Sequence, residues 1–132
     1  PCAMGMASVF YDVLNKIVID LAIHPRLTSE RACAQDHLQF AQENDLVLLD
    51  RGYTAFWLYA YFLQRNIRFC MRAKSHQDSR VKNFVRSGKK EAIVTFYPNK
   101  SSIKTCEDKG LSTKPIRLRL VRVDLPGEVA VL

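Results

Sequence analysis

One aspartate stands where a carboxylate could hold a metal ion. Asp50 follows four consecutive apolar residues, Leu46–Leu49, and such a run predicts a strand buried on both faces of a parallel or mixed sheet. Ligands of open α/β sheets bind beyond the carboxyl ends of the strands. Gly52 permits a sharp exit, and Thr54 is placed to cap a following helix. Asp50 is therefore a candidate metal ligand, and the alternative is a turn or capping residue.

The second half of the chain carries the basic charge. The whole chain has a net charge of +7, with −3 in residues 1–64 (4 Lys and Arg, 7 Asp and Glu) and +10 in residues 65–132 (16 against 6). This asymmetry favours a nucleic-acid partner, and a solvated basic surface is the alternative. The candidate phosphate contacts are Arg51, Arg72, Lys74, Arg80 and Lys82, with Arg86, Lys89 and Lys90 extending the patch.

Zinc fingers and membrane proteins are disfavoured. The four cysteines form no C-x-x-C pair and the three histidines are scattered, so zinc-finger spacing is absent. Cys33 and Cys70 lie in apolar segments and are expected to be reduced core residues of a cytoplasmic protein. The longest apolar stretch, Ala55–Leu63, is about half the length that a bilayer requires, and no signal peptide is apparent.

The elements expected to position Asp50 are a hairpin, two helices and two further strands. Hydrophobic periodicity and turn residues define them. The hairpin consists of strands over residues 7–14 and 17–23 around an Asn15-Lys16 turn. A helix is predicted to start at Thr28 or Ser29, with an apolar face of Ala34, Leu38 and Ala41. The strand that ends at Asp50 is followed by an aromatic helix over 54–64 and by a strand over 67–71, which closes a β-α-β unit.

The character of the chain changes near residue 75. Residues 75–90 form a polar and basic run, and residues 98–115 are predicted to be a loop. Strands are predicted over 91–97, over 116–123 and from Val129 onward. The sequence therefore predicts an α/β core over residues 1–76 and a basic β-rich segment over residues 77–132.

Three segments together resemble the core of bacterial DDE transposases. They are Ser29-Glu30-Arg31, then Leu48-Leu49-Asp50-Arg51-Gly52-Tyr53, and then Arg68-Phe69-Cys70-Met71-Arg72-Ala73-Lys74. The D-R-G-Y sequence is similar to the signature of the insertion-sequence-four type, and the R-x-K strand follows about twenty residues later. The resemblance covers residues 7–74 and, more loosely, 115–132.

This resemblance implies a partial ribonuclease H-like mixed sheet with flanking helices, followed by a β-rich insertion. It implies a site of two aspartates and one glutamate around Mg²⁺ or Mn²⁺, with Asp50 as the second aspartate. The first strand and the last helix, which carry the other two acids, are expected to lie outside this chain. Asp12 and Asp20 lie on the hairpin and are expected to be structural or solvent-exposed.

The implied function is metal-dependent cleavage and transfer of double-stranded DNA at transposon ends by phosphoryl transfer. Arg72 and Lys74 are then expected to face DNA beside the site. The parent protein is expected to act as a homodimer in the bacterial cytoplasm, associated with the nucleoid, and this segment alone is expected to be inactive.

Other functions remain open. One is a non-catalytic DNA-binding or assembly module in which Asp50 is structural, and another is a ribonuclease H-like nuclease. A restriction-type nuclease is disfavoured, because that family needs an acid two residues before a lysine, and Arg72 occupies this position before Lys74.

Overall fold

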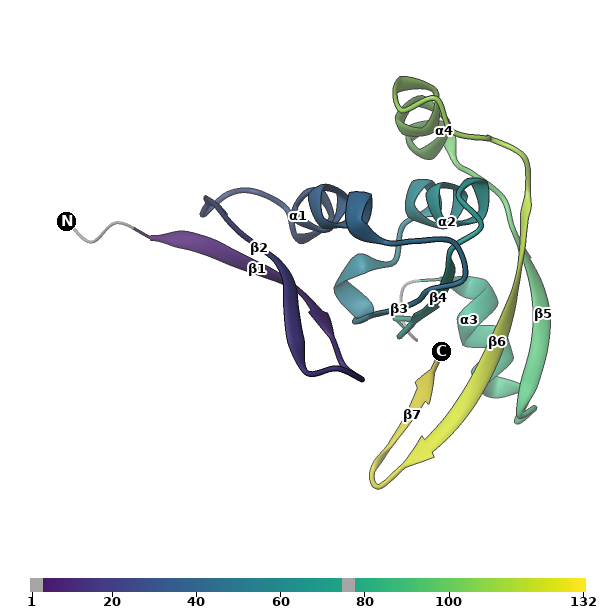
Figure 1. The fold of residues 1–132 in the computed structure, drawn as a ribbon. Helices are drawn as coiled ribbons and strands as arrows, with labels where there is room; N and C mark the ends of the chain where they lie inside the picture. Colours follow the sequence, from purple (N-terminus) through teal and green to yellow (C-terminus); the bar gives the residue numbers. More distant parts are fainter. Residues whose placement is uncertain (1–3, 75–77) are drawn as a thin grey trace. The chain divides into compact units, whose positions relative to one another are not determined.

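The computed structural model describes residues 4–74 and 78–132 and has a mixed α/β architecture (Figure 1). The chain divides after Gln42 into two compact units, and each is described by itself. The predicted domain boundary between residues 76 and 77 lies outside the described residues and stays a prediction. No helix among the described residues is long and apolar enough to span a bilayer.

The N-terminal unit contains the predicted hairpin. Strand β1 (Gly5–Asp12) pairs antiparallel with β2 (Ile17–Pro25). The first strand ends two residues earlier than predicted, because the Asp12 carboxylate accepts hydrogen bonds from the backbone N–H groups of Leu14 and Asn15, both at 2.9 Å. These bonds draw residues 13 and 14 into the turn.

Helix α1 (Glu30–His37) follows the hairpin and begins as predicted. The Ser29 hydroxyl accepts a hydrogen bond from the Ala32 N–H and caps the helix. The buried face carries Cys33 and Ala34, and Leu38 begins a short 3₁₀ turn (Leu38–Phe40).

The C-terminal unit begins with the predicted β-α-β unit. Strand β3 (Leu46–Leu49) pairs in parallel with β4 (Arg68–Met71), and helix α2 (Phe56–Gln64) connects them. The Phe69 ring of β4 stacks on Tyr59 and Phe62 of α2, with ring centroids 5.7 and 5.0 Å apart. The aromatic helix is thus packed on the sheet, as predicted.

Two details at β3 correct the sequence-based expectation. The strand is buried on one face only, since Val47 is 5% exposed while Leu46 and Leu48 are 60% and 61% exposed. The physical reason is that this sheet has two strands and no described element of the C-terminal unit covers its second face. Thr54 does not cap α2; its hydroxyl donates to the Arg51 carbonyl at 3.2 Å, and the helix begins after Ala55.

The remaining strands form a second sheet in the same unit. Strands β5 (Glu91–Phe96), β6 (Ile116–Leu125) and β7 (Glu128–Val131) pair antiparallel in the order β5-β6-β7. All three strands were predicted, although β6 is two residues longer than expected.

Two helices in this region are absent from the sequence prediction. Helix α3 (Ser79–Arg86) lies in the basic run, and α4 (Lys100–Asp108) lies in the predicted loop. The Asp78 carboxylate caps α3 and the Asn99 side chain caps α4. Val81 and Phe84 of α3 pack in the core with β-strand residues, so the segment is α/β rather than mainly β.

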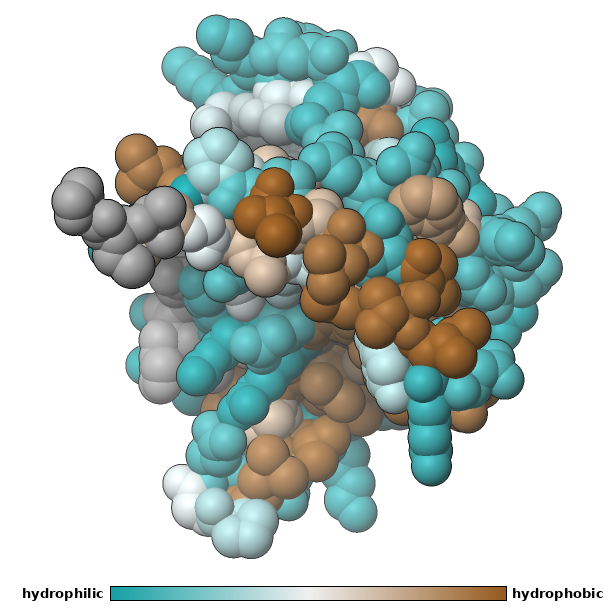
Figure 2. All heavy atoms as spheres, turned by 60° about the vertical axis from the view of Figure 1, so that its left-hand side comes forward, coloured by the Kyte–Doolittle hydropathy of each residue, from teal (hydrophilic) through white to brown (hydrophobic). Residues whose placement is uncertain are grey.

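Large apolar side chains are also exposed at the surface. Figure 2 shows apolar groups gathered among polar ones on one face of the molecule. In the hairpin, the exposed members include Val9, Leu21 and Ile23. These side chains alternate with half-buried residues along β1 and β2, so the described residues of the N-terminal unit leave one face of the hairpin uncovered.

Candidate active site and nucleic-acid interface

Asp50 lies at the carboxyl end of β3 and is exposed. Its backbone is extended (φ −75°, ψ 173°), and its carbonyl accepts a hydrogen bond of 3.1 Å from the Tyr53 N–H, which closes the 3₁₀ turn Arg51–Tyr53. The Asp50 carboxylate makes no hydrogen bond or ion pair within the described parts of the chain. The side chain is therefore available to an external ligand.

The parallel pairing of β3 and β4 brings Arg72 to the same sheet edge. The Arg72 N–H donates to the Leu49 carbonyl at 3.1 Å and extends the ladder by one residue. Since carboxyl ends of parallel strands meet at one edge, Asp50 and Arg72 begin the loops that leave it.

The edge of the β3–β4 sheet offers a metal ion one carboxylate ligand, Asp50. Among residues 4–74 and 78–132, no three His, Cys, Asp or Glu side chains are grouped to hold a metal ion. A carboxylate oxygen suits Mg²⁺, so Asp50 fits as one ligand, but the described residues do not complete a site.

The Arg72 guanidinium is engaged by an acid. Its Nη2 atom donates to Oε1 of Glu128, the first residue of β7, at 2.7 Å. The two side chains are 30% and 52% exposed, and such surface pairs contribute about 0–1 kcal/mol. A phosphate group can therefore displace Glu128 at small cost.

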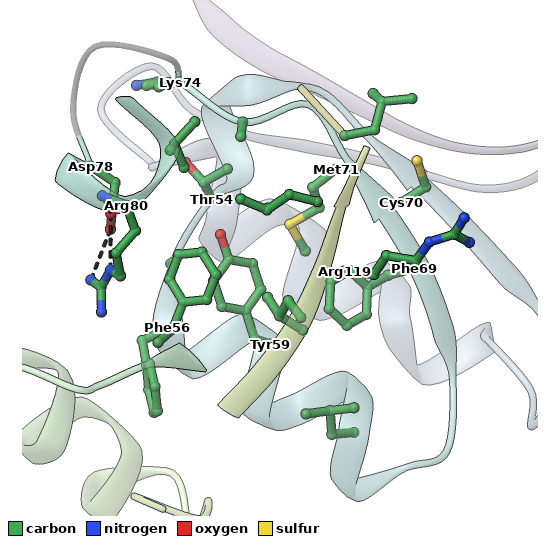
Figure 3. Close-up of a pocket in the computed structure, with 18 of the residues that line it drawn as sticks. Thr54, Phe56, Tyr59, Phe69, Cys70, Met71, Lys74, Asp78, Arg80 and Arg119 are labelled. Atoms are coloured by element: carbon green, nitrogen blue, oxygen red, sulfur yellow. Dashed lines mark hydrogen bonds and ion pairs between the residues drawn. The ribbon is translucent and has the colours of Figure 1, made fainter. Parts of the chain in front are cut away.

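Arg80 is held more firmly. Its Nε and Nη2 atoms donate to the two Asp78 carboxylate oxygens, both at 2.9 Å, and its guanidinium lies 4.8 Å from the centroid of the Phe96 ring (Figure 3). The hydrogen bonds from Arg80 lower the pKa of Asp78, and those to Asp78 raise the pKa of Arg80. Arg80 therefore anchors the start of α3.

Lys74 and Arg80 line a pocket of about 730 Å³ in the C-terminal unit (Figure 3). Its lining includes aromatic side chains such as Phe56, Tyr59 and Phe96. Asp50, together with the other predicted site residues Arg51, Arg72 and Lys82, does not line it. The structure thus separates the predicted basic residues into groups with different surroundings.

Lys82 and Arg86 lie on the exposed face of α3, four residues apart, opposite the buried Val81 and Phe84. The side chains of these two cations, and that of the exposed Arg51, have no hydrogen bond or ion pair within the described residues. These three side chains are available to bind phosphate, as are the exposed Lys89 and Lys90 that follow α3.

The N-terminal unit contains a polar network that the sequence analysis missed. His37 is 3% exposed; its Nδ1 atom lies 2.6 Å from Oδ2 of Asp20, and its Nε2 atom lies 2.9 Å from Oγ of Ser8. The network joins α1 to both strands of the hairpin. Asp20 therefore has a structural role, as expected. The network could have been inferred from the sequence, because Ser8 and Asp20 are polar residues on the inward face of β1 and β2, and buried polar groups need hydrogen-bond partners.

Comparison with known protein families gives a match over most of the chain. A family model described as "Transposase DDE domain" matches residues 4–120, which is most of the chain and includes both Asp50 and α3. No curated protein and no solved structure matches. The chain therefore belongs to the family of transposase DDE domains, whose function is DNA cleavage and transfer of the transposase type.

Proposed function

We propose that Asp50 is a metal-binding catalytic carboxylate of a DDE transposase of the insertion-sequence-four type. The observation that carries this proposal is an exposed carboxylate without a partner among the described residues, at the carboxyl end of a strand in a parallel β-α-β unit. Structural aspartates in this chain are engaged differently. Asp12, Asp20 and Asp78 each have hydrogen-bond partners.

Divalent metal would supply the chemistry of phosphoryl transfer. Paired metal ions activate the attacking oxygen and stabilise the leaving oxygen. Asp50 would hold a metal ion through a carboxylate oxygen, and bound waters would fill other positions. In a ribonuclease H-like arrangement, the other two acids would come from a strand before β1 and a helix after β7. The present chain alone is then expected to cleave no DNA.

The DNA contacts would come from two places. Arg51 adjoins Asp50 and Arg72 leaves the same sheet edge, so both could grip the phosphates next to the reacting one. Lys82 and Arg86 would bind backbone phosphates along α3. A homodimer on paired transposon ends, in the bacterial cytoplasm, completes the proposal.

The first test measures Mn²⁺ binding by paramagnetic broadening of amide NMR signals. Weak binding at Asp50 should broaden the signals of Arg51 and Gly52 first, and Asp50→Asn should abolish that local effect. The matched control is Asp45→Asn, because Asp45 lies at the opposite end of β3. Equal broadening in wild-type protein and Asp50→Asn would refute Asp50 as a ligand.

A second test uses the gene on both sides of this segment. An upstream strand that ends in Asp and a downstream helix with Y-x2-R-x3-E would support the transposase site. If both are absent and DNA binding persists in Asp50→Asn, the non-catalytic DNA-binding module is the better description. Robust DNA cleavage by the present chain with Mg²⁺ or Mn²⁺ would contradict the proposed incomplete site.

A further inference from the structure

The pocket in the C-terminal unit is a groove between two sheets. Its lining includes Phe69 and Met71 of β4, which Figure 3 labels, and Leu118 and Leu120 of β6. Leu132 also belongs to the lining. The groove is thus bordered by two strands that belong to different sheets.

The β6 border is a free strand edge. The Arg122 N–H donates to the Lys90 carbonyl at 2.8 Å, on the side of β5. Backbone groups alternate sides along an antiparallel strand, so those of Arg117 and Arg119 point away from β5. No backbone hydrogen bond joins these groups to any described residue on that side.

The β4 border is also free. The N–H groups of Arg68 and Arg72 donate to carbonyls of the β3 segment, at 3.0 and 3.1 Å. The backbone groups of Phe69 and Met71 therefore point away from β3, and they have no backbone partner among the described residues. Two edges with unpaired donors and acceptors thus border one apolar groove, and this is the arrangement that accepts an added strand.

Strand β7 already enters the groove. Val121 and Leu132 exchange two backbone hydrogen bonds of 2.9 Å, which ties the end of β7 to β6. One residue earlier, the Val131 carbonyl accepts a 2.7 Å hydrogen bond from the Ala73 N–H, which follows β4. The end of β7 therefore lies between β4 and β6 and is bonded to both sides.

We propose that the groove binds an extended strand that continues β7 directly beyond Leu132 in a longer polypeptide. This strand pairs antiparallel with β6 on one side and lies along β4 on the other. It joins the two sheets into one, in the order β3-β4-β7-β6-β5. The proposal does not depend on the chemistry of Asp50.

The register of β7 fixes the side chains that the groove prefers. Val131 is fully buried and lies opposite Arg122. Since the side-chain period of a strand is two, the first, third and fifth residues after Leu132 face the core beside Leu120, Leu118 and Ile116. These positions require apolar residues.

The second and fourth residues lie opposite Arg119 and Arg117 on the outer face. The Arg119 side chain is paired with Glu91, while Arg117 is exposed and has no ion pair within the described chain. An acidic residue is therefore favoured at the fourth position.

The test appends five residues to Leu132. One extension, Val-Thr-Val-Glu-Val, has the predicted phase, and its control, Glu-Val-Val-Val-Thr, has the same composition with polar residues turned inward. Amide hydrogen exchange at Arg117, Arg119, Phe69 and Met71 should slow at least tenfold in the first extension and not in the second. Equal rates in both extensions would overturn the proposal.

Disulfide cross-linking tests the strand register by a second measurement, which does not depend on how much the extension stabilises the fold. Leu118 and the third appended residue form a non-hydrogen-bonded pair, in which Cα atoms lie about 4.5 Å apart, within the range of a disulfide. Leu118→Cys should therefore link to a cysteine at the third position under mild oxidation, as mapped by peptide mass spectrometry. A cysteine at the second position is the control, and equal linkage at both would contradict the register.

Discussion

The exposed face of α3 provides the sharpest prediction about DNA. Lys82 and Arg86 are one helical turn apart, exposed, and without an ion pair among the described residues. Each phosphate contact adds about 0.9 to the slope of log affinity against log salt. The variant Lys82→Ala/Arg86→Ala should therefore lower the magnitude of the slope by about 1.8. As the salt concentration rises from 50 to 200 mM, the ratio of wild-type to variant affinity for DNA should therefore fall about twelvefold.

The assay is fluorescence anisotropy of a labelled duplex across a salt series. Alanine favours helix, so α3 should persist, and circular dichroism checks this. The control variant Lys16→Asn/Arg26→Ala removes the same charge from the exposed surface of the N-terminal unit, and Asn tolerates the positive φ of Lys16 (58°). An unchanged slope in the α3 variant, or an equal loss in the control, would refute the assignment.

Two further predictions concern stability. The lowered pKa of Asp78 means that its bonds to Arg80 stabilise the fold above the ordinary carboxyl pKa of about 3.9 and lose this effect as the pH falls below it. Asparagine can still cap the helix, so Asp78→Asn removes mainly the charge that binds Arg80 and should cost about 0.5–1 kcal/mol at pH 7. Urea titrations should show that the difference in unfolding free energy between wild type and variant disappears below pH 3, and a difference that stays constant with pH would contradict this. His37→Leu should cost about 1–3 kcal/mol by the same method, because it leaves Asp20 without its partner, whereas the exposed Gln39→Leu should cost less.

The sequence predicted the elements around Asp50 because their signals are local. The run Leu46–Leu49 has strand character, and the apolar helix that follows can only be buried, so the β-α-β unit follows from short-range pattern. The burial of β3 was wrong for a tertiary reason. The apolar run forms one strand of a two-stranded sheet in which only one face is covered. A sequence pattern carries no information on which helices or strands lie against each face of the sheet.

Helices α3 and α4 were missed although capping signals exist. Asp78 and Asn99 have the side chains preferred at helix starts. Gly88 and Gly110 follow the helix ends with φ of 68° and 64°, as glycine permits. The apolar face of α3 was not recognised because it is short. Only Val81, Phe84 and Val85 of that helix are apolar, and they alternate with basic and polar residues.

The basic site residues show a different limit. Sequence reasoning treated the cations as one patch, but Arg72 meets Glu128 from 56 residues away and Arg80 is held by Asp78. Net charge predicts a partner and not which cations remain available to it. Only the fold distinguishes the exposed Lys82 from the engaged Arg80.

The proposed metal site at Asp50 and the proposed strand continuing β7 both involve the β3–β4 sheet. The carbonyls of Asp45 and Leu49 accept hydrogen bonds from the β4 segment, so the backbone groups of Leu46 and Leu48 point to the other edge of β3, where no described strand pairs with them. A strand parallel to β3 at this edge would end beside Asp50, because parallel strands present their carboxyl ends together. An acid at its tip would then share a metal ion with Asp50, while the strand continuing β7 would secure the sheet from the β4 side. The same two-stranded sheet would thus become the centre of a larger one, and its central position would hold Asp50 rigidly for in-line phosphoryl transfer.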